Sequence, residues 1–345
     1  MKNTIVGVDL AKNVIQVCVV TRKKVIFNKE MTTENFSVWL SNYQSSVVVF
    51  ESCATSNYWK QKAASLGHDA RLISAKLVAN IRQNQKTDKN DALAIVQASQ
   101  LIDIQFIQGK NFPQQELQSI SRMRELAVKQ KVALKNQITA LLLEFNIRVS
   151  ARNGGLRGVV EQVLEDAENG FSCHFRKALY ETWKAYLSIV DRISEYEDNL
   201  RASIDLNPDC KKLMALESVS TINAVHLYTT LACGEKNLFK SAKDASACVG
   251  LTPVQYSSGG KVKLGSIGKH VKNSLVRSNL ITGAMAVIQQ LCKREPRTLK
   301  EKWLKELVER RGKRCAAVAL ANKTVRTAFA MLRDGTEYKA QPLIV

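Results

Sequence analysis

The sequence lacks any stretch of about 20 apolar residues, the length that a membrane-spanning helix needs. Its start also lacks the apolar run and small-residue cleavage site of a secretory signal, so we expect a cytoplasmic protein with no membrane partner. None of its eight cysteines forms a CxxC pair, and the four histidines do not stand at ligand spacing to them. A structural zinc site is therefore not expected, and the thiols are expected to be reduced.

Positive charge is abundant and unevenly distributed. The formal net charge is +20, and residues 236–345 carry 22 Lys and Arg against seven Asp and Glu. Residues 106–235 are neutral, with 16 of each sign, and residues 1–105 carry 13 basic against eight acidic residues. A neutral spacer between two basic ends predicts two surfaces that meet a polyanion, so nucleic acid is the expected partner.

The first third of the chain is typical of a mixed α/β domain. Strands are expected where β-branched residues are concentrated, and helices between them. The expected strands are 4–9, 14–20, 24–29, 46–50 and 70–73, and the expected helices are 34–43, 58–66, 77–82 and 88–101. A strand meander followed by strand–helix alternation predicts a mixed sheet flanked by helices, ending near Gly109–Pro113.

The middle and the last third are predicted to be helical. A 3-4 spacing, which is typical of a coiled coil, occurs in residues 120–141 and 179–204. The first stripe, in which two glutamines stand among apolar residues, consists of Ile120, Met123, Ala127, Gln130, Leu134, Gln137 and Leu141. The clearer stripe consists of Leu179, Trp183, Tyr186, Val190, Ile193, Glu197, Leu200 and Ile204. These helices could pair within one chain or across a dimer. Short helices are expected over 213–249, a glycine-rich loop over 252–269, and further helices at 273–291, 298–310 and 316–332.

Four carboxylates stand at strand ends or at a helix start in the first third. Asp9 ends the first expected strand, Glu51 follows a later one, and Asp88 and Asp91 are three residues apart at an expected helix start. Carboxylates at the ends of adjacent strands converge, and clustered anions need divalent cations. Two Mg²⁺ ions held there could activate a nucleophile and stabilise the leaving oxygen in phosphoryl transfer.

Other interpretations of these acids are available. Each residue alone has a structural explanation: Asp9 as a strand end, Glu51 as a solvated loop residue, and Asp88 as a charge in a helix's first turn. Sugar kinases and actin-like ATPases also begin with a strand ending in Asp, but they need glycine and Thr or Ser next to it. Here Leu10, Ala11 and Lys12 follow, so that class is disfavoured.

Several motifs, in order, resemble those of the DEDD-type insertion-sequence transposases of the 110/1111 group, to which Piv-type DNA invertases are similar. The motifs are GVDLAKN at 7–13, FES at 50–52, KTDKNDA at 86–92, GLTPVQYSSGGKVKLGSIGK at 250–269 and RRGKRCAAVALANK at 310–323. The resemblance covers nearly the whole chain. It implies that Asp9, Glu51, Asp88 and Asp91 are the catalytic metal-binding acids, and that Ser258 is the nucleophile.

The C-terminal motif has neighbours and departures that bear on this assignment. Ser257 is an adjacent competitor for Ser258, and without the resemblance the SSGG segment would be taken as a flexible loop. Family members commonly have Ile-Ser-Lys or Ile-Thr-Lys where this chain has Ile267–Gly268–Lys269. Many also carry a Gly-Ile-Gly turn where this chain has 219–223, Val-Ser-Thr-Ile-Asn. The expected nucleic-acid-binding residues are Lys86, Lys261, Lys263, Lys269, Arg310, Arg311, Lys313 and Arg314.

Together these observations predict three domains and a DNA recombinase. We expect a ribonuclease-H-like (RuvC-like) α/β nuclease domain at 1–110, a helical coiled-coil spacer at 111–208 and a helical basic domain with the serine at 209–345. The resemblance implies Mg²⁺-dependent cutting and rejoining of DNA through a phosphoserine, a structured guide RNA, and a homo-oligomer, a dimer or a synapsed tetramer. The alternatives are a junction-resolving nuclease that hydrolyses with water, and an inactive nucleic-acid-binding protein.

Overall fold

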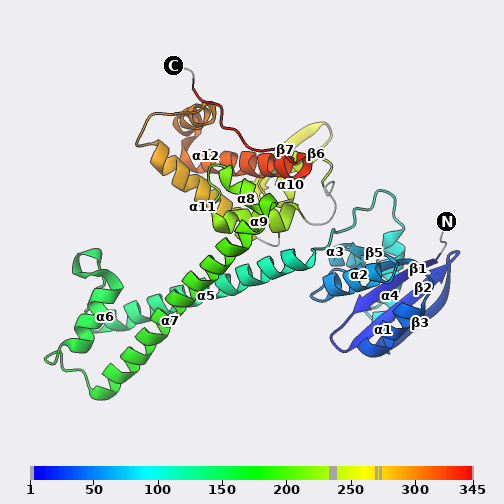
Figure 1. The fold of residues 1–345 in the computed structure, drawn as a ribbon, viewed down its shortest axis with the longest axis horizontal. Helices are drawn as coiled ribbons and strands as arrows, with labels where there is room; N and C mark the ends of the chain where they lie inside the picture. Colours follow the sequence, from blue (N-terminus) through cyan, green and yellow to red (C-terminus); the bar gives the residue numbers. More distant parts are fainter. Residues whose placement is uncertain (1–3, 233–238, 269–270, 272–273, 344–345) are drawn as a thin grey trace. The chain divides into compact units, whose positions relative to one another are not determined.

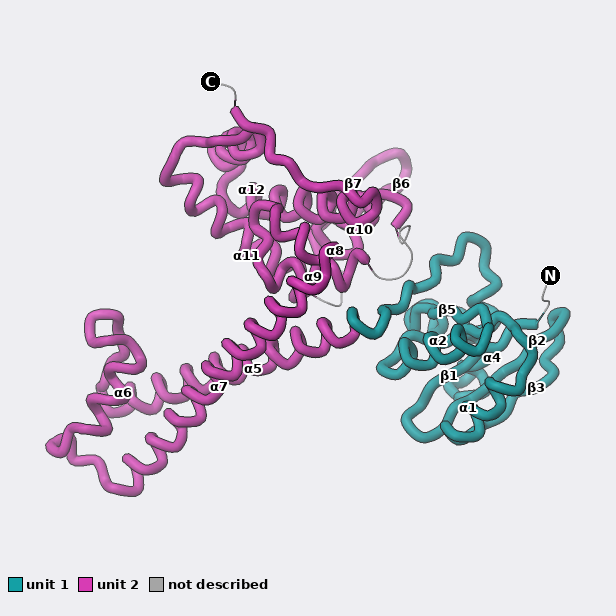
Figure 2. Tube along the Cα trace, in the orientation of Figure 1, with its two compact units in different colours: residues 1–114, 233–238 teal, residues 115–232, 239–345 magenta. Residues whose placement is uncertain are grey.

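A computed structural model describes residues 4–232, 239–268, 271 and 274–343 (Figure 1). The described chain forms two compact units, 4–114 and 115–232 with 239–343 (Figure 2). Each unit is treated by itself below. The expected boundaries at 110/111 and 208/209 remain predictions.

The first unit is built on one mixed five-stranded sheet with the strand order β3-β2-β1-β4-β5. Strands β1, β2 and β3 are antiparallel neighbours, whereas β4 runs parallel to β1 and β5 runs parallel to β4. The strands are β1 (Thr4–Leu10), β2 (Val14–Thr21), β3 (Lys24–Thr32), β4 (Val47–Glu51) and β5 (Asp69–Ile73). All five expected strands are confirmed within a few residues, and so is the mixed α/β class.

Helices cover both faces of this sheet (Figure 1). Helices α1 (Thr33–Asn42) and α2 (Ser56–Ser65) pack on one face, and α3 (Ala75–Ile81) and α4 (Asp88–Ser99) pack on the other. Side chains alternate between the two faces along a strand. In β1, Val6 and Val8 pack in the same core as α1 and α2, so the residues between and after them face α4. Asp9 is one of those residues, which decides where the candidate site lies.

The second unit is mainly helical, as expected. Its long elements are α5 (Phe112–Glu144), which begins at the end of the first unit, α7 (Cys173–Asp205), α11 (Ser274–Leu291) and α12 (Leu299–Asp334). The shorter ones are η1 (Ala151–Asn153), α6 (Gly155–Glu165), α8 (Pro208–Lys211), η2 (Lys212–Ala215), α9 (Thr221–Leu231) and α10 (Ala242–Cys248). Helix α6 was not expected, because its glycines suggested only a connection. None of the helices among the described residues is long and apolar enough to cross a membrane.

Most of the apolar stripe of α7 is buried within this single chain, although Val190 is 37% exposed. Leu179, Trp183, Ile193, Leu200 and Ile204 are at most 7% exposed, and Arg124 on α5 pairs with Glu197 on α7. The stripe expected on α5 was partly wrong, because Met123 is 48% exposed and Gln130 and Gln137 also face solvent. Ala127 of that stripe is buried, and the other buried residues of α5 lie outside it: Gln114, Leu117, Ser121, Ile138 and Leu142.

An antiparallel hairpin of β6 (Pro253–Ser258) and β7 (Lys261–Ile267) replaces most of the loop expected over 252–269, so that expectation was wrong. Ser258 pairs with Lys261, and only Gly259 and Gly260 join the two strands. Their φ angles are +54° and +75°, the left-handed pair that a tight two-residue hairpin turn requires. The two glycines therefore specify a defined turn rather than a flexible loop.

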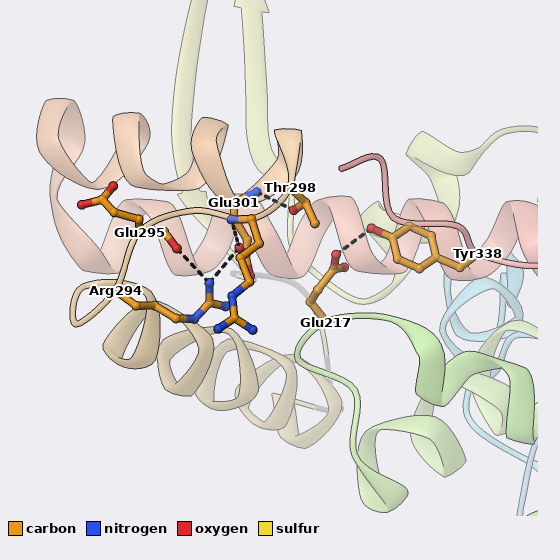
Figure 3. Close-up of polar contacts among 7 residues, drawn as sticks. Glu217, Arg294, Glu295, Thr298, Glu301 and Tyr338 are labelled. Atoms are coloured by element: carbon orange, nitrogen blue, oxygen red, sulfur yellow. Dashed lines mark hydrogen bonds and ion pairs between the residues drawn. The ribbon is translucent and has the colours of Figure 1, made fainter. Parts of the chain in front are cut away.

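Helix α12 and the segment after it complete the second unit's core. Gly312 interrupts α12 with φ +80° and ψ 163°, which separates the two helices that the sequence predicts there. Beyond α12, Tyr338 donates a 2.7 Å hydrogen bond to Glu217 (Figure 3). Glu217 also pairs with Lys300 at 2.6 Å. These contacts hold the C-terminal segment against α12 and the chain before α9.

Candidate active site and nucleic-acid surface

Asp9 and Glu51 lie side by side at the carboxyl ends of two parallel strands. Val8 of β1 pairs with Phe50 of β4, so the next residue of each strand is an acid. Both acids share the sheet face that α4 covers, because each alternates with a residue packed on the opposite face. The strand register therefore brings two carboxylates together, as the sequence suggested.

Helix α4 brings the other two acids to the same edge, and Gly7 permits its approach. A Cβ at Gly7 would lie 2.5 Å from the carbonyl oxygen of Ala92, so only glycine lets the helix pack this closely on β1. The side chain of Thr87 caps α4, which begins at Asp88 as expected. Asp88 is exposed, while Asp91 is 8% exposed.

The four carboxylates act on one another electrostatically. Burial raises the pKa of Asp9, and the negative charges of Asp91 and Asp88 raise it further. Burial, followed by the charges of Asp9 and Asp91, likewise raises the pKa of Glu51. Lys86 opposes both shifts. The acids thus share one negative field that a bound cation would relieve.

Arg82 enters this cluster and was not expected there. Its Nη1 donates to Asp91 Oδ1 at 2.6 Å, with both side chains largely buried. Among the described residues, no group of three or more His, Cys, Asp or Glu side chains is arranged to hold a metal ion. The only sequence signal for Arg82 was its place shortly before the KTDKNDA motif.

The donor atoms at this edge nevertheless fit a hard divalent cation. The acids offer only oxygen ligands, which Mg²⁺ prefers. Gln16 pairs with Asp9 across β1 and β2, and it is 2% exposed. Its Nε2 donates to Asn28 at 2.6 Å, while its Oε1 has no hydrogen-bond partner among the described residues. A buried oxygen without a donor, on the same face as the acids, suits a site that accepts positive charge.

Ser258 lies in the second unit, at the exposed tip of the β6–β7 hairpin. Ser257 and Ser258 project from opposite faces of β6, because successive strand residues alternate. The Oγ of Ser257 accepts a 2.9 Å hydrogen bond from Gln255, on the same face. The hairpin thus distinguishes the two serines that the sequence alone left adjacent and equivalent.

Gly268 explains one departure from the family motif. Its φ is +71°, and a Cβ there would overlap the guanidinium of Arg277 on α11. Gly250, with φ +77°, also lies against the Arg277 side chain. A serine or threonine at 268 has no room while Arg277 occupies this position, so glycine and arginine fit together here.

The expected nucleic-acid-binding cations lie in three places. Lys86 is exposed just before α4, and Lys261 and Lys263 are exposed on β7. Arg310, Arg311, Lys313 and Arg314 are exposed on both sides of the break at Gly312. Lys269 falls outside the described residues. The structure groups four cations around one helix break, a surface that an extended polyanion can follow.

Two family profiles match the chain in the order of these sites. Residues 6–147, with the acids, match a DEDD-type transposase profile, and residues 210–300, with the hairpin, match the transposase IS116/IS110/IS902 family. The transposase for insertion sequence element IS1111A of Coxiella burnetii is 31% identical, over 97% of this chain and 91% of its own length. The chain belongs to this transposase family.

Two further relatives are similar over nearly their full length. A probable family 20 transposase of Pseudomonas aeruginosa is 29% identical, over 97% of this chain and 98% of its own. A pilin gene-inverting protein of Moraxella bovis is 20% identical over 98% of both chains. These similarities support DNA transposition or recombination as the general activity, and they confirm the family that the motifs suggested.

Proposed function

We propose that this transposase cuts and rejoins DNA through a covalent phosphoserine at Ser258, aided by Mg²⁺ at Asp9, Glu51, Asp88 and Asp91. The observation that carries the proposal is the hairpin, which presents Ser258 at an exposed tip, directly before two turn glycines. Glycines beside a nucleophile allow a DNA backbone to come close. A hydrolytic nuclease has no need of such a hairpin.

A ribonuclease-H-like fold for the first unit is part of this proposal. Its support is a central sheet in which an antiparallel meander joins parallel strands, with acids at the ends of β1 and β4. A helix crossing the same edge contributes two more acids. This arrangement is suited to phosphate chemistry at the sheet edge.

The acids would hold one or two Mg²⁺ ions. When bound, Mg²⁺ supplies positive charge at the scissile phosphate and lowers the pKa of a bound hydroxyl. Asp91 is engaged by Arg82 in this structure, so its use as a ligand requires that ion pair to open. Arg82 would then be free to contact a DNA phosphate at the same edge.

The reaction step conserves the energy of the phosphodiester. The Ser258 oxygen attacks phosphorus, the bond from phosphorus to the leaving strand breaks, and the serine proton ends on the leaving hydroxyl group. A second strand's hydroxyl then attacks the phosphoserine and restores the serine. One ester bond is exchanged for another at each step, so rejoining needs no nucleotide cofactor.

An oligomer and a structured guide RNA complete the proposal. Apolar side chains remain exposed on α5, including Met123 at 48% and Leu126 at 58%, and a second copy could cover them. The four cations around Gly312 would accommodate RNA as well as DNA. Acids and serine lie in different units, so the serine could also come from another copy.

The test is to trap the protein–DNA adduct on a cleavable element end. We expect an adduct at Ser258 by mass spectrometry, none in Ser258→Ala, and substantial adduct in Ser257→Ala. Mixing Ser258→Ala with Asp9→Asn protein should restore some cleavage if the site is shared between copies. Recombination that persists in Ser258→Ala would favour the hydrolytic nuclease.

A further inference from the structure

A hollow of about 1040 Å³ opens on the second unit, and neither the four acids nor Ser258 lines it. One face of the C-terminal half of α12 forms its floor, and Ala242, Leu251 and Ile267, the last residue of β7, also line it. Cys315, Ala319 and Ala330 lie on this face, at helical spacing. Their small side chains keep the hollow open and largely apolar.

The charged side chains that line it are positive. Among the described residues they are Arg314, Lys323 and Arg326, and no described carboxylate lines the hollow. Within the described part of the chain these three cations form no ion pair, whereas Lys300 and Arg294 nearby are each paired with a glutamate. An apolar floor with three uncompensated cations is complementary to an apolar group that carries negative charge.

An aromatic ring lies in the same hollow. Trp303 is partly exposed, and the Nζ of Lys323 lies 4.5 Å from the centroid of its ring. Aromatic rings stack on the faces of unpaired nucleobases regardless of base identity, and neighbouring Lys and Arg contact the phosphates. In a duplex those base faces are already stacked, so paired DNA cannot use the ring.

We propose that this hollow binds unpaired nucleotides, with bases against Trp303 and the apolar floor and phosphates at Arg314, Lys323 and Arg326. A helix from a second copy would leave three cations buried without partners, which disfavours that occupant. The inference rests on the proposed function, because strand exchange and a guide RNA both supply unpaired nucleotides. It names the residues that would hold them.

The test measures binding alone, in the Ser258→Ala background, so that it does not depend on cleavage. Fluorescence anisotropy compares a 12-nucleotide deoxythymidine strand, a 12-nucleotide uridine strand and a 12-base-pair duplex. Ala319→Phe fills the hollow without changing charge, and should weaken binding of single strands about tenfold while leaving the duplex unchanged. Ala185→Phe, on the exposed surface of α7, is the matched control and should change neither.

Two further measurements keep the proposal falsifiable. Arg326→Gln, at an exposed position, adds no bulk and should also weaken single-strand binding. Ultraviolet crosslinking of a 5-bromouracil strand should map to the peptide with Trp303, and the two homopolymers show whether DNA or RNA is preferred. Single-strand affinity unchanged in both variants, equal weakening of the duplex, or loss of self-association alone in Ala319→Phe would overturn the proposal. In those cases, an adduct that still forms at Ser258 when Ala319→Phe is made in protein that keeps Ser258 would leave the proposed function standing.

Discussion

The two units hold their functional side chains in different ways. In the first, the acids are attached to the sheet and to a helix packed directly on it, and burial raises the pKa of Asp9 and Glu51. In the second, Ser258 and most of the candidate cations lie on the surface, on a hairpin tip and around a helix break. Core packing positions the acids of the first unit, whereas the geometry of the hairpin turn positions Ser258 in the second.

Because of this difference, we expect folding stability and catalytic activity to be coupled in the first unit and largely independent in the second. A change in the packing beneath the acids should alter both folding and cleavage, because the same contacts serve both. In the second unit, contacts that hold the helices together are distant in sequence from the hairpin tip. Changes there should alter folding while leaving Ser258 able to react. The predictions below test that contrast.

The largest expected effect comes from removing one acid while keeping its shape. Asp9→Asn, Glu51→Gln, Asp88→Asn and Asp91→Asn should each reduce cleavage of an element end on the order of a thousandfold or more. Because burial and neighbouring acids disfavour the charged form of Asp9, Asp9→Asn should melt at an unchanged or higher temperature. Nucleic-acid binding should persist.

The assay for these variants is strand cleavage in Mg²⁺, with melting followed by circular dichroism. Asp103→Asn is a matched control on an exposed residue of the same unit and should cleave like the parent protein. Two acid variants that cleave fully would exclude the proposed metal cluster. A variant that fails to fold would instead show that the acid supports the sheet.

The second unit should lose stability in mild acid because of His226. This histidine of α9 is 6% exposed and lies 3.3 Å from Ser121 and 3.5 Å from Glu125 on α5. Burial, and then the charge of Arg124, lowers its pKa from 6.5 to about 4, so the contact with Glu125 involves a neutral ring. Unfolding below pH 6.5 takes up a proton, so stability is lost as pH falls toward 4, by about 3 kcal/mol.

Urea unfolding at pH 7.0 and 4.5 measures this loss. His226→Gln retains a polar side chain but cannot titrate, so its stability should fall less over the same interval. Both proteins contain the same carboxylates. The difference between their losses of unfolding free energy over this pH interval therefore measures the contribution of His226. Parallel stability curves for the two proteins would show that His226 is not the group responsible.

Much of the first unit could be predicted from sequence, because its signals are local. β-Branched runs specify the strands, and Thr87 with Asp88 specifies the start of α4. Arg82 could not be predicted as a partner of Asp91, since that contact depends on how the turn before α4 folds back. The role of Gly7 is similar: the sequence shows a glycine in a strand, but only packing shows what approaches it.

The second unit was predicted less well for a physical reason. On α5, polar residues share the expected stripe, so periodicity alone could not decide which face is buried, and Met123 was assigned to the wrong side. At the hairpin, glycine content suggested flexibility, although two adjacent glycines between alternating residues also specify a tight turn. The hollow beside Trp303 depends on contacts between segments far apart in sequence, so no local sequence pattern predicts it.

Gly7→Ala should reduce both stability and cleavage, because in the first unit the same packing contacts support the fold and position the acids. The added Cβ would meet the Ala92 carbonyl oxygen at 2.5 Å and Val96 Cγ2 at 2.7 Å, so α4 must shift away from β1. Overpacking of this kind costs about 2 kcal/mol. The same shift moves Asp88 and Asp91 away from Asp9, so cleavage should fall even where the protein is fully folded.

Gly67→Ala is the control for this change. Gly67 has open space around it but a φ of +84°, so alanine there strains the backbone without moving a helix. It should lose about 1 kcal/mol of stability and retain cleavage. If Gly7→Ala also retains full cleavage at a temperature where it is folded, the close approach of α4 does not position the acids.

The smallest effect is expected at the C-terminal segment of the second unit, from Tyr338→Phe. Burial opposes ionisation of Glu217, yet hydrogen bonds from Lys300 and Tyr338 lower its pKa, so the carboxylate is charged and both donors stabilise it. Phenylalanine keeps the ring under the Lys300 ammonium, 5.0 Å from its centroid, and removes only the 2.7 Å hydrogen bond (Figure 3). Because Lys300 still pairs with Glu217, the free energy of unfolding should fall by only about 1 kcal/mol.

Tyr180→Phe, at a half-exposed position on α7, is the matched control and should not change the stability. Adduct formation at Ser258 should be the same in both variants at 25 °C, since neither touches the hairpin. A loss of adduct in folded Tyr338→Phe would mean that stability and chemistry are coupled in the second unit as well, and the contrast between the units would fail.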